Sequence, residues 1–276
     1  MSWVVEPAAA LADGPDSRAF AYGDGVFTSA AVREGTVLLL AEHLERLSSG
    51  CSRLGISPPS RERLHRMADA AVAADGARTG MLKLVVVRGG TERGYRPAVE
   101  AGTVVYGRLF PAAGADEWLD EQTLAATVSP FALSTQPALA GVKHLNRLEQ
   151  VLALQAASGG DEAICVDTEG FLVSASSANL FFVCDETLCT PALTRAGIAG
   201  VTRGAVLAIA GELGIRVSVA DFRPSDLLGC QEMLLSNSRY GIRPLVRIDD
   251  TVRPVGSLTR RLHAALLAKV GLCAGS

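Results

Sequence analysis

The chain has 276 residues, of which 49% are hydrophobic and 20% are charged, and its formal net charge is −3. This length is enough for one large domain, or for two domains of about 130 residues with substantial cores. The near-neutral charge disfavours a broad nucleic-acid or anionic-membrane surface, which needs clustered excess base. No apolar run approaches the roughly 20 residues of a membrane helix, and the first residues show no signal-peptide pattern, so we expect a cytoplasmic protein.

In the N-terminal third, apolar runs and turn residues predict a compact α/β arrangement. We expect the elements in this order: strands at 26–32 and 36–40, helices from about 44 to 55 and from 60 to 75, and strands at 81–87 and 103–109. Ser60 is the expected N-cap of the second helix, and Gly55 ends the first. A Gly- and Arg-rich loop separates the last two strands, and aperiodic turn residues at 110–117 predict a domain boundary.

The second half mixes short strands with helices. We expect strands at 123–128, 163–166, 171–173, 179–183, 233–236 and 242–248, and helices at 146–157, 200–213 and 257–270. Because strands and helices alternate irregularly, a mixed α/β (α+β) pair of domains fits better than a doubly wound sheet. The expected division is an N-terminal α/β domain at 1–110, a linker at 111–120 and a C-terminal domain at 121–276.

Six cysteines without a C-x-x-C pair and four scattered histidines show no metal-ligand spacing, so free thiols and no metal are expected. Lysine is scarce, because only three of the 26 basic residues are lysines. Lys83 alternates with leucines and is expected on the solvent side of its strand, and Lys269 suits the last turn of the final helix. Lys143 lies in a mainly apolar stretch, where desolvation lowers the pKa of an amine and favours a Schiff base. The alternative is a lysine that extends from a helix start into solvent.

Three further segments could bind anions. Residues 197–203 form a Gly-rich entry to a helix, where free amides and the Thr202 hydroxyl could bind a phosphate. Residues 236–244 carry hydroxyl and amide groups that could do the same or simply close a turn. The arginines of the loop at 88–96 could bind a carboxylate or lie in solvent.

Several segments together carry a resemblance to a known family. They are YGDGVF at 22–27, AEHLERL at 41–47, KLVVVR at 83–88 with RGY at 93–95, AGVKHLNRLEQV at 140–151, DEA at 161–163, SANLF at 177–181, AGIAGVTR at 196–203 and the stretch 226–244. In this order they resemble the class IV pyridoxal-phosphate enzymes, which include branched-chain and D-amino-acid aminotransferases and 4-amino-4-deoxychorismate lyase. The run around Lys143 is most similar to that of the lyase.

The resemblance implies a fold type IV enzyme, with a small N-terminal α/β sandwich, a larger C-terminal pseudo-barrel, pyridoxal 5'-phosphate between them and a homodimer as the assembly. Lys143 would bind the cofactor covalently and act as acid and base, and Arg46 would bind its phosphate. The rest of the phosphate site would come from Ala199, Val201, Thr202, Asn237 and Ser238. Arg93, and after it Arg88 and Arg96, would orient the carboxylates of a small-molecule substrate.

One position departs from the family pattern. Where the family places a glutamate that keeps the cofactor's pyridine nitrogen protonated, this chain has Ser174, which makes the ring a poorer electron sink. Elimination of pyruvate depends on that sink less than amino transfer does. The resemblance therefore predicts a lyase, with a D- or branched-chain amino-acid aminotransferase as the alternative. A cofactor-binding member with little turnover is a second alternative.

Overall fold

The computed structural model of the protein describes residues 3–7, 14–74, 76–90, 94–98, 101–112, 117–120, 122–157 and 160–272. Its contacts divide the chain into two compact units. Unit 1 comprises Met1–Ala115 and Val142–Asn146, and unit 2 comprises Asp116–Gly141 and Arg147–Ser276. The division expected from the sequence has all of 121–276 in the second domain, whereas Val142–Asn146 makes its contacts within unit 1. The chain thus passes from unit 1 to unit 2, returns to unit 1 for a short segment and ends in unit 2.

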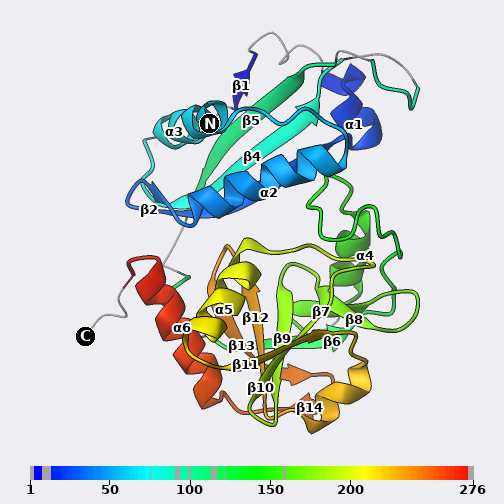
Figure 1. The fold of residues 1–276 in the computed structure, drawn as a ribbon, viewed down its shortest axis with the longest axis vertical. Coiled ribbons are helices and arrows are strands. Elements are labelled where there is room, and N and C mark those ends of the chain that lie inside the picture. Colours follow the sequence, from blue (N-terminus) through cyan, green and yellow to red (C-terminus); the bar gives the residue numbers. More distant parts are fainter. Residues whose placement is uncertain are drawn as a thin grey trace. The chain divides into compact units, whose positions relative to one another are not determined.

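Unit 1 is built on a five-stranded antiparallel sheet with the order β1-β5-β4-β2-β3 (Figure 1). Its elements are a 3-10 turn at Gly14–Asp16, β1 (Val4–Glu6), α1 (Arg18–Tyr22), β2 (Gly25–Arg33), β3 (Thr36–Val37), α2 (Leu40–Arg53), α3 (Arg61–Ala73), β4 (Gly80–Arg88) and β5 (Thr103–Pro111). The predicted N-cap Ser60 is confirmed, since its hydroxyl accepts a hydrogen bond from the amide of Arg63. The predicted hairpin is shorter than expected. Leu39 has a left-handed φ of 52° and α2 begins at the next residue, so the second strand ends at Val37.

Both long helices of unit 1 pack on one face of the sheet. α2 contacts β2, and α3 contacts β5 and β4. Successive side chains of a strand point to opposite faces, and Leu82, Leu84 and Val86 of β4 join the apolar sides of the two helices in one buried core. Lys83, between them, therefore lies on the other face of the sheet.

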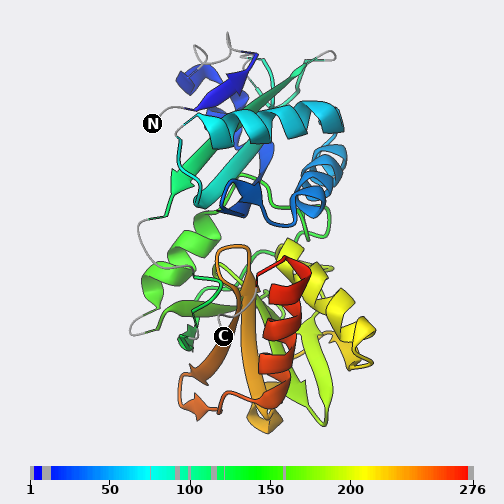
Figure 2. The same ribbon diagram turned by 90° about the vertical axis from the view of Figure 1, so that its left-hand side faces the viewer.

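Unit 2 contains a nine-stranded mixed sheet with the order β11-β10-β9-β12-β13-β6-β7-β8, and β14 pairs with β13. Its elements are β6 (Leu124–Val128), α4 (Leu148–Ala156), β7 (Glu162–Val166), β8 (Leu172–Ala175), β9 (Asn179–Cys184), β10 (Thr187–Pro191), α5 (Val201–Glu212), β11 (Arg216–Ala220), a 3-10 helix at Pro224–Gly229, β12 (Glu232–Asn237), β13 (Gly241–Ile248), β14 (Thr251–Val252) and α6 (Ser257–Lys269). α5 and α6 lie side by side, and α6 packs on β12 and β13 (Figure 2). Within the ranges given above, no helix has the length and apolar character needed to cross a bilayer.

The sheet of unit 2 is strongly curled. β8 ends the strand order and β9 lies five positions away from it, yet only residues 176–178 connect the two strands. Such a connection spans at most about 14 Å, whereas five strand spacings in a flat sheet cover about 24 Å. The sheet must therefore bend until β8 and β9 approach each other, and the amide of Ala175 donates to the carbonyl of Ala178 across the turn. The curl confirms the expected pseudo-barrel and, with unit 1, the mixed α/β class.

Several short elements are absent from the sequence prediction, namely β1, α1, β10, β11 and β14. β10 follows β9 after only two residues, Asp185 and Glu186, which have positive φ values of 46° and 58°. Turns of this kind are usually signalled by Asn-Gly or Asp-Gly. Here Asp185 is followed by glutamate in place of glycine, so the turn signal in the sequence is weak.

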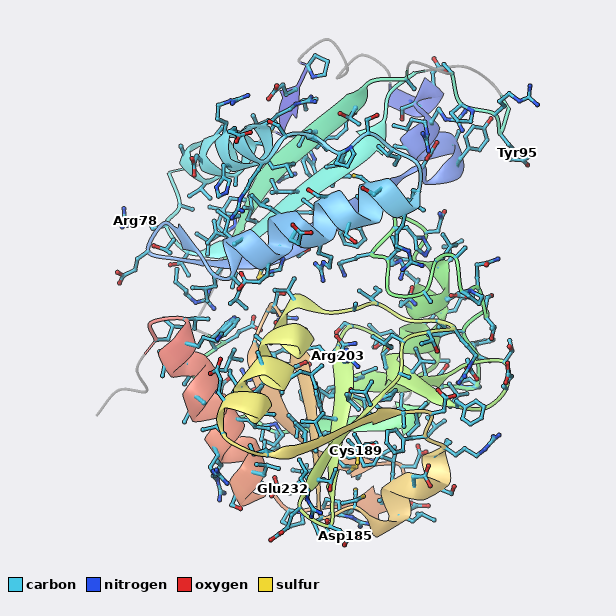
Figure 3. All side chains as sticks on the ribbon, in the orientation of Figure 1. Arg78, Tyr95, Asp185, Cys189, Arg203 and Glu232 are labelled. Atoms are coloured by element: carbon cyan, nitrogen blue, oxygen red, sulfur yellow. The ribbon has the colours of Figure 1, made fainter. Side chains whose placement is uncertain are left out.

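A buried carboxylate fixes the start of α6. Glu232 of β12 accepts hydrogen bonds from the amides of Leu258 and Thr259 and from the Thr259 hydroxyl, at 3.1, 2.8 and 2.7 Å (Figure 3). Gly256, the N-cap, supplies no side-chain hydrogen bond, and a Cβ at this position would collide with the Glu232 carboxyl group. Glu232 therefore replaces the missing cap and places a negative charge at the positive end of the helix dipole.

Candidate active site

Lys143 comes from the middle of the chain but belongs to the sheet of unit 1. The N-terminal half of β2 has an open edge, because β3 pairs only with the C-terminal end of that strand. Val142–Asn146 fills the edge. The amide of Phe27 donates to the Lys143 carbonyl and the amide of Leu145 donates to the Gly25 carbonyl, each at 3.0 Å. These bonds hold the Lys143 backbone, and its Nζ lies 4.5 Å from the centre of the Phe27 ring.

Two glycines allow the lysine segment to approach β2 so closely. A Cβ on Gly25 would lie 2.6 Å from the Val86 carbonyl oxygen and 3.0 Å from a methyl group of Leu145. Gly23 has a φ of 64°, and the Asn146 side chain occupies the place that a Cβ would take there. The motif YGDGVF, which by itself indicates only a turn, is therefore the place where the lysine segment packs.

A buried group of polar side chains lies between β2 and α2. Thr28 and His43 are each 1% exposed, and Thr28 Oγ1 lies 2.6 Å from His43 Nδ1. Arg46 donates a hydrogen bond of 2.5 Å to the same hydroxyl oxygen. His43 and Arg46 are three residues apart in α2 and so project on the same side. The Nε atom of Arg46 is buried, and within the described ranges it has no hydrogen-bond partner.

Burial and neighbouring charges shift the pKa values of this group. The pKa of His43 lies well below its usual value, first because the imidazole is desolvated and then because Arg46 and Lys143 are nearby cations. Burial lowers the pKa of Arg46 to about 10. At neutral pH, His43 is therefore neutral and Arg46 remains charged. The charges that act on His43 are both positive, which suits the binding of an anion.

The other two lysines have structural partners. Lys83 lies on the face of the sheet away from the helices, as predicted, but it is only half-exposed, and its Nζ lies 5.0 Å from the centre of the same Phe27 ring. The contact between Lys83 and Phe27 could not be expected from the sequence, because it exists only once β4 pairs with β2. Lys269 ends α6 as predicted and pairs with Glu212 at 3.3 Å.

In unit 2, the glycine loop leads into α5 with free donors. Gly200 is the N-cap of α5 and supplies no side-chain hydrogen bond, while the Thr202 hydroxyl is buried without a partner among the described residues. An uncapped helix start beside a free hydroxyl suits a phosphate. Of the two expected backbone positions, Val201 begins the helix, whereas the amide of Ala199 is occupied by the carbonyl of Gly141 at 3.0 Å.

At the end of β12, the hydroxyl that has no partner in the described ranges belongs to Ser236, the first residue of the candidate segment 236–244, whereas the resemblance had pointed to Asn237 and Ser238. Ser236 is 1% exposed, and its Oγ lacks a hydrogen-bond partner in the part of the chain that the structure describes. The side-chain oxygen of Asn237 accepts hydrogen bonds of 2.9 and 3.1 Å from two amides of the following turn. The Ser238 carbonyl accepts one from the indole of Trp118. Asn237 thus closes the turn, and Ser236 offers an additional hydroxyl for an anion.

Ser174, at the position where the family pattern has a glutamate, is buried in β8 opposite Cys165 of β7. The neighbouring strand β7 does carry a buried carboxylate, that of Glu162, but the hydroxyls of Ser176 and Ser177 bind it. These hydrogen bonds hold the turn between β8 and β9. Position 174 therefore contributes a hydroxyl and no charge.

The three arginines expected to orient a substrate differ in their exposure and in their hydrogen bonds. Arg93 lies outside the described residues, and Arg96 is exposed. Arg88 donates to Asp24 at 2.9 Å and to the two carbonyls that follow α2 at 2.7 and 2.8 Å. Its guanidinium is therefore committed to the end of α2 and to the turn before β2.

A second arginine extends this network to the loop after β4. Arg18 donates to Asp24 at 2.9 Å and to the carbonyls of Gly94 and Tyr95 at 2.9 and 3.1 Å. The Tyr22 hydroxyl accepts a hydrogen bond from the amide of Gly94. Tyr95, labelled in Figure 3, is 88% exposed, and the centre of its ring lies 5.5 Å from that of Tyr22. Gly94 and Tyr95 are therefore anchored to unit 1 through their backbone and through this ring contact.

Comparison with known proteins places these residues in a family, because the family model for class IV amino-transferases matches residues 25–248. The chain belongs to the class IV aminotransferase family. Among class IV relatives, the aminodeoxychorismate lyase of Vibrio harveyi is 34% identical, over 90% of this chain and 93% of the relative. A putative branched-chain-amino-acid aminotransferase of Methanocaldococcus jannaschii is 32% identical, over 87% and 85%. The crystal structure of 4-amino-4-deoxychorismate lyase from Pseudomonas aeruginosa is 39% identical, covers 98% of this chain and 99% of that one, and superposes with a TM-score of 0.88.

The class IV assignment confirms the resemblance found in the sequence. Among the described residues, Cys51, Cys165, Cys184, Cys189 and Cys230 are free thiols. Cys273 lies outside those residues. The same residues contain no group of three His, Cys, Asp or Glu side chains that could hold a metal ion.

The neutral state of His43 makes the stability of the protein depend on pH. Below about pH 6.5 the unfolded chain protonates this histidine and the folded chain does not. The free energy of unfolding should therefore fall by about 1.4 kcal/mol per pH unit as the pH drops from that value towards the lower folded pKa. Urea unfolding at about pH 7 and pH 5.5 measures the slope. The His43→Gln variant should lose the part of this pH dependence that comes from His43. The control His65→Gln, on α3, should keep the full pH dependence. An unchanged slope in His43→Gln would contradict the prediction.

Proposed function

We propose that this class IV protein is a pyridoxal-phosphate-dependent lyase that converts 4-amino-4-deoxychorismate to 4-aminobenzoate and pyruvate, a step of folate precursor synthesis in the cytoplasm. The lyases at 34% and 39% identity over nearly the whole chain support this activity. The observation that carries the proposal is the position of Lys143. Its backbone is bound to β2, and its charge acts on a histidine whose neighbour is an arginine with an unused donor.

The residues present fit pyridoxal phosphate. Several of the buried polar atoms without a partner in the described ranges are donors, and they include Arg46 Nε in unit 1 and the hydroxyls of Thr202 and Ser236 in unit 2. Buried donors are rarely left unpaired, and the oxygens of a phosphate ester can accept hydrogen bonds from such groups. Within unit 2, we assign the phosphate to the hydroxyls of Thr202 and Ser236 and to the amide of Val201, with Asn237 and Ser238 shaping the turn beside Ser236. Within unit 1, Arg46 Nε is the donor that we assign to a phosphate.

The reaction needs one group that moves a proton, and Lys143 fills that role. The bound cofactor supplies electron withdrawal from the substrate carbon that carries the amine. The Lys143 amine removes the proton from that carbon, the bond from the ring to the enolpyruvyl oxygen breaks, and Lys143 returns the proton to the methylene carbon of the leaving group. Pyruvate and the aromatic amine are the products, so atoms and charges balance.

The substrate carries two carboxylates that need cations. We propose that Arg93 and Arg96 bind them, because both lie in the loop whose backbone Arg18 anchors and Arg96 is exposed. Arg88 supports this loop indirectly, because Arg88 and Arg18, the arginine that holds the loop backbone, both donate a hydrogen bond to Asp24. Substituting Arg88 would therefore disturb the fold of the loop rather than remove a direct contact.

Amino transfer is the alternative activity, and the relative from M. jannaschii carries that name. Ser174 favours elimination instead. A hydroxyl stabilises a protonated pyridine nitrogen less well than a carboxylate, and amino transfer depends most on this stabilisation. Elimination depends on it less, because the leaving enolpyruvyl group takes charge with it and the ring becomes aromatic.

Purified protein with enzymatically made aminodeoxychorismate should release 4-aminobenzoate and pyruvate in equal amounts. Lys143→Ala should lower this rate by about 1,000-fold, the range of a missing general acid and base, and should remove the absorbance of the covalently bound cofactor. Lys269→Ala, which removes another lysine far along the chain, should leave both unchanged. Conversion of the cofactor spectrum by an amino acid alone, without 4-aminobenzoate, would instead indicate an aminotransferase. If neither 4-aminobenzoate release nor conversion of the cofactor spectrum is observed, the protein is a cofactor-binding member with little turnover.

Restoring a carboxylate at position 174 should raise amino transfer. In Ser174→Glu, we expect the half-reaction with D-alanine or L-leucine, followed as the change in the cofactor spectrum, to be about tenfold faster. Ser174→Gln, which has the same size without the charge, is the control and should show no gain. Equal rates in both variants would mean that the partner of the pyridine nitrogen does not limit amino transfer.

We propose that the protein is a homodimer and that α4 lies in the interface. The sequence places Leu148, Val151 and Leu152 on one face of this helix, and in the single chain that face is exposed by 76%, 57% and 46%. Ala153 on the opposite side is buried. A continuous apolar stripe of this kind is typical of an association surface.

Charges on this stripe should separate the two copies. Leu148→Glu combined with Leu152→Glu should shift the protein from dimer to monomer in light scattering at micromolar concentration, because two carboxylates would have to be desolvated in each subunit. Leu228→Glu changes another exposed leucine, outside α4, and should stay dimeric. A dimeric double variant would exclude α4 from the interface.

A further inference from the structure

Thr28 and His43 form a buried polar pair to which the proposed reaction assigns no role. Both side chains are 1% exposed, and they meet between β2 and α2 with 2.6 Å between Thr28 Oγ1 and His43 Nδ1. Burying a hydroxyl and an imidazole costs free energy that apolar side chains in the same places would avoid. The neighbours on α2, Leu44 and Leu47, are indeed core residues. The pair therefore calls for an explanation beyond packing.

The hydrogen bonds of this pair have a definite direction. A guanidinium has donors only, so Thr28 Oγ1 accepts the 2.5 Å hydrogen bond from Arg46. The same oxygen could accept a second hydrogen bond from a protonated Nδ1, but the buried hydroxyl proton would then have no acceptor among the described residues. We therefore assign that proton to His43 Nδ1, in the tautomer whose Nδ1 carries no proton. Desolvation lowers the pKa of His43 and so keeps the ring neutral. The hydrogen bonds thus run from Arg46 to Thr28 and from Thr28 to His43.

This direction determines how the arginine is held. A guanidinium is planar and rigid, so fixing one terminal nitrogen at Thr28 also sets where the Nε–H of Arg46 points. That Nε is buried and unpartnered within the ranges described. A protonated His43 would place a second cation beside Arg46 and could not accept from Thr28, which would release the guanidinium from this orientation.

We propose that Thr28 and His43 are positioning residues that hold Arg46 in the orientation in which it binds the phosphate of the cofactor. The proposal rests on the proposed function only in taking pyridoxal phosphate as the anion. It is independent of whether the bound cofactor then supports elimination or amino transfer. Neither residue touches the phosphate, and both act through Arg46.

The test separates binding of the phosphate from binding of the rest of the cofactor. Full-length protein stripped of cofactor is titrated with pyridoxal phosphate and, separately, with pyridoxal, which has the same ring and aldehyde but no phosphate. Thr28→Val keeps the shape of the side chain and removes the hydroxyl. It should weaken binding of pyridoxal phosphate about tenfold, the usual effect of losing a hydrogen bond to a charged group, and leave pyridoxal unchanged. Thr28→Ser should recover most of the lost affinity.

Two results of this titration overturn the proposal. An equal loss for both ligands makes Thr28 a structural residue, and no loss for either means that Arg46 does not need it. Nitrogen NMR of His43 in the unsubstituted protein gives a second measurement that does not depend on a folded variant. At about pH 7, Nδ1 should carry no proton, and a protonated Nδ1 would contradict the hydrogen-bond direction.

The same titration separates this proposal from the proposed function. Unsubstituted protein that binds pyridoxal as tightly as pyridoxal phosphate would overturn both the positioning roles and the phosphate site. Tight, phosphate-dependent binding without release of 4-aminobenzoate would refute the lyase alone and leave the roles of Thr28 and His43 standing.

Discussion

Pairing between the open edge of β2 and the segment Val142–Asn146 is the constraint on which the candidate site depends. Two backbone hydrogen bonds add this segment to a sheet made otherwise of residues before position 112. They place Lys143 over the Phe27 ring and beside the polar group of α2. Glycines 23 and 25 leave room for this packing, since a Cβ on Gly23 would collide with the Asn146 side chain, and one on Gly25 would collide with the Val86 carbonyl of β4 and crowd Leu145. Without this pairing, the lysine would be an ordinary residue of a connecting loop.

The second feature of the site is a set of buried donors that have no hydrogen-bond partner among the described residues. A desolvated guanidinium is costly unless its donors are paired, yet Arg46 keeps a buried Nε without a partner in the described chain. The charges of Arg46 and Lys143 both act on His43. His43 avoids a third charge by staying neutral. Thr202 and Ser236 leave hydroxyl donors unpaired in unit 2 as well. Departures of this kind from complete pairing are typical of functional sites, where a bound ligand supplies the missing partner.

The third feature is the buried hydroxyl of Ser174, at the position where the family pattern has a glutamate. It is buried in a short strand of the curled sheet, and the nearby carboxylate of Glu162 is taken up by the hydroxyls of the adjoining turn. The buried carboxylate of Glu162 therefore holds the turn between β8 and β9. A cofactor bound with a hydroxyl at position 174 withdraws electrons less strongly. Such a site suits a reaction whose leaving group carries charge away, which agrees with the lyases among the relatives.

The sequence by itself determined the family, the mixed α/β class and most helices and strands, because these follow from local periodicity and from motifs of consecutive residues. It also singled out Lys143 and Arg46, since their motifs are long and specific. It assigned no role to Thr28 or His43, and it named Ser236 only as part of the segment 236–244, because the partners of these buried side chains are set by tertiary contacts. Only the tertiary structure decided that the lysine segment belongs to unit 1, that Arg88 is committed to the end of α2, and that the apolar face of α4 is exposed. Each of these outcomes depends on which distant segments pair, and pairing between distant segments is set by edges, cavities and charges that exist only once the chain has folded.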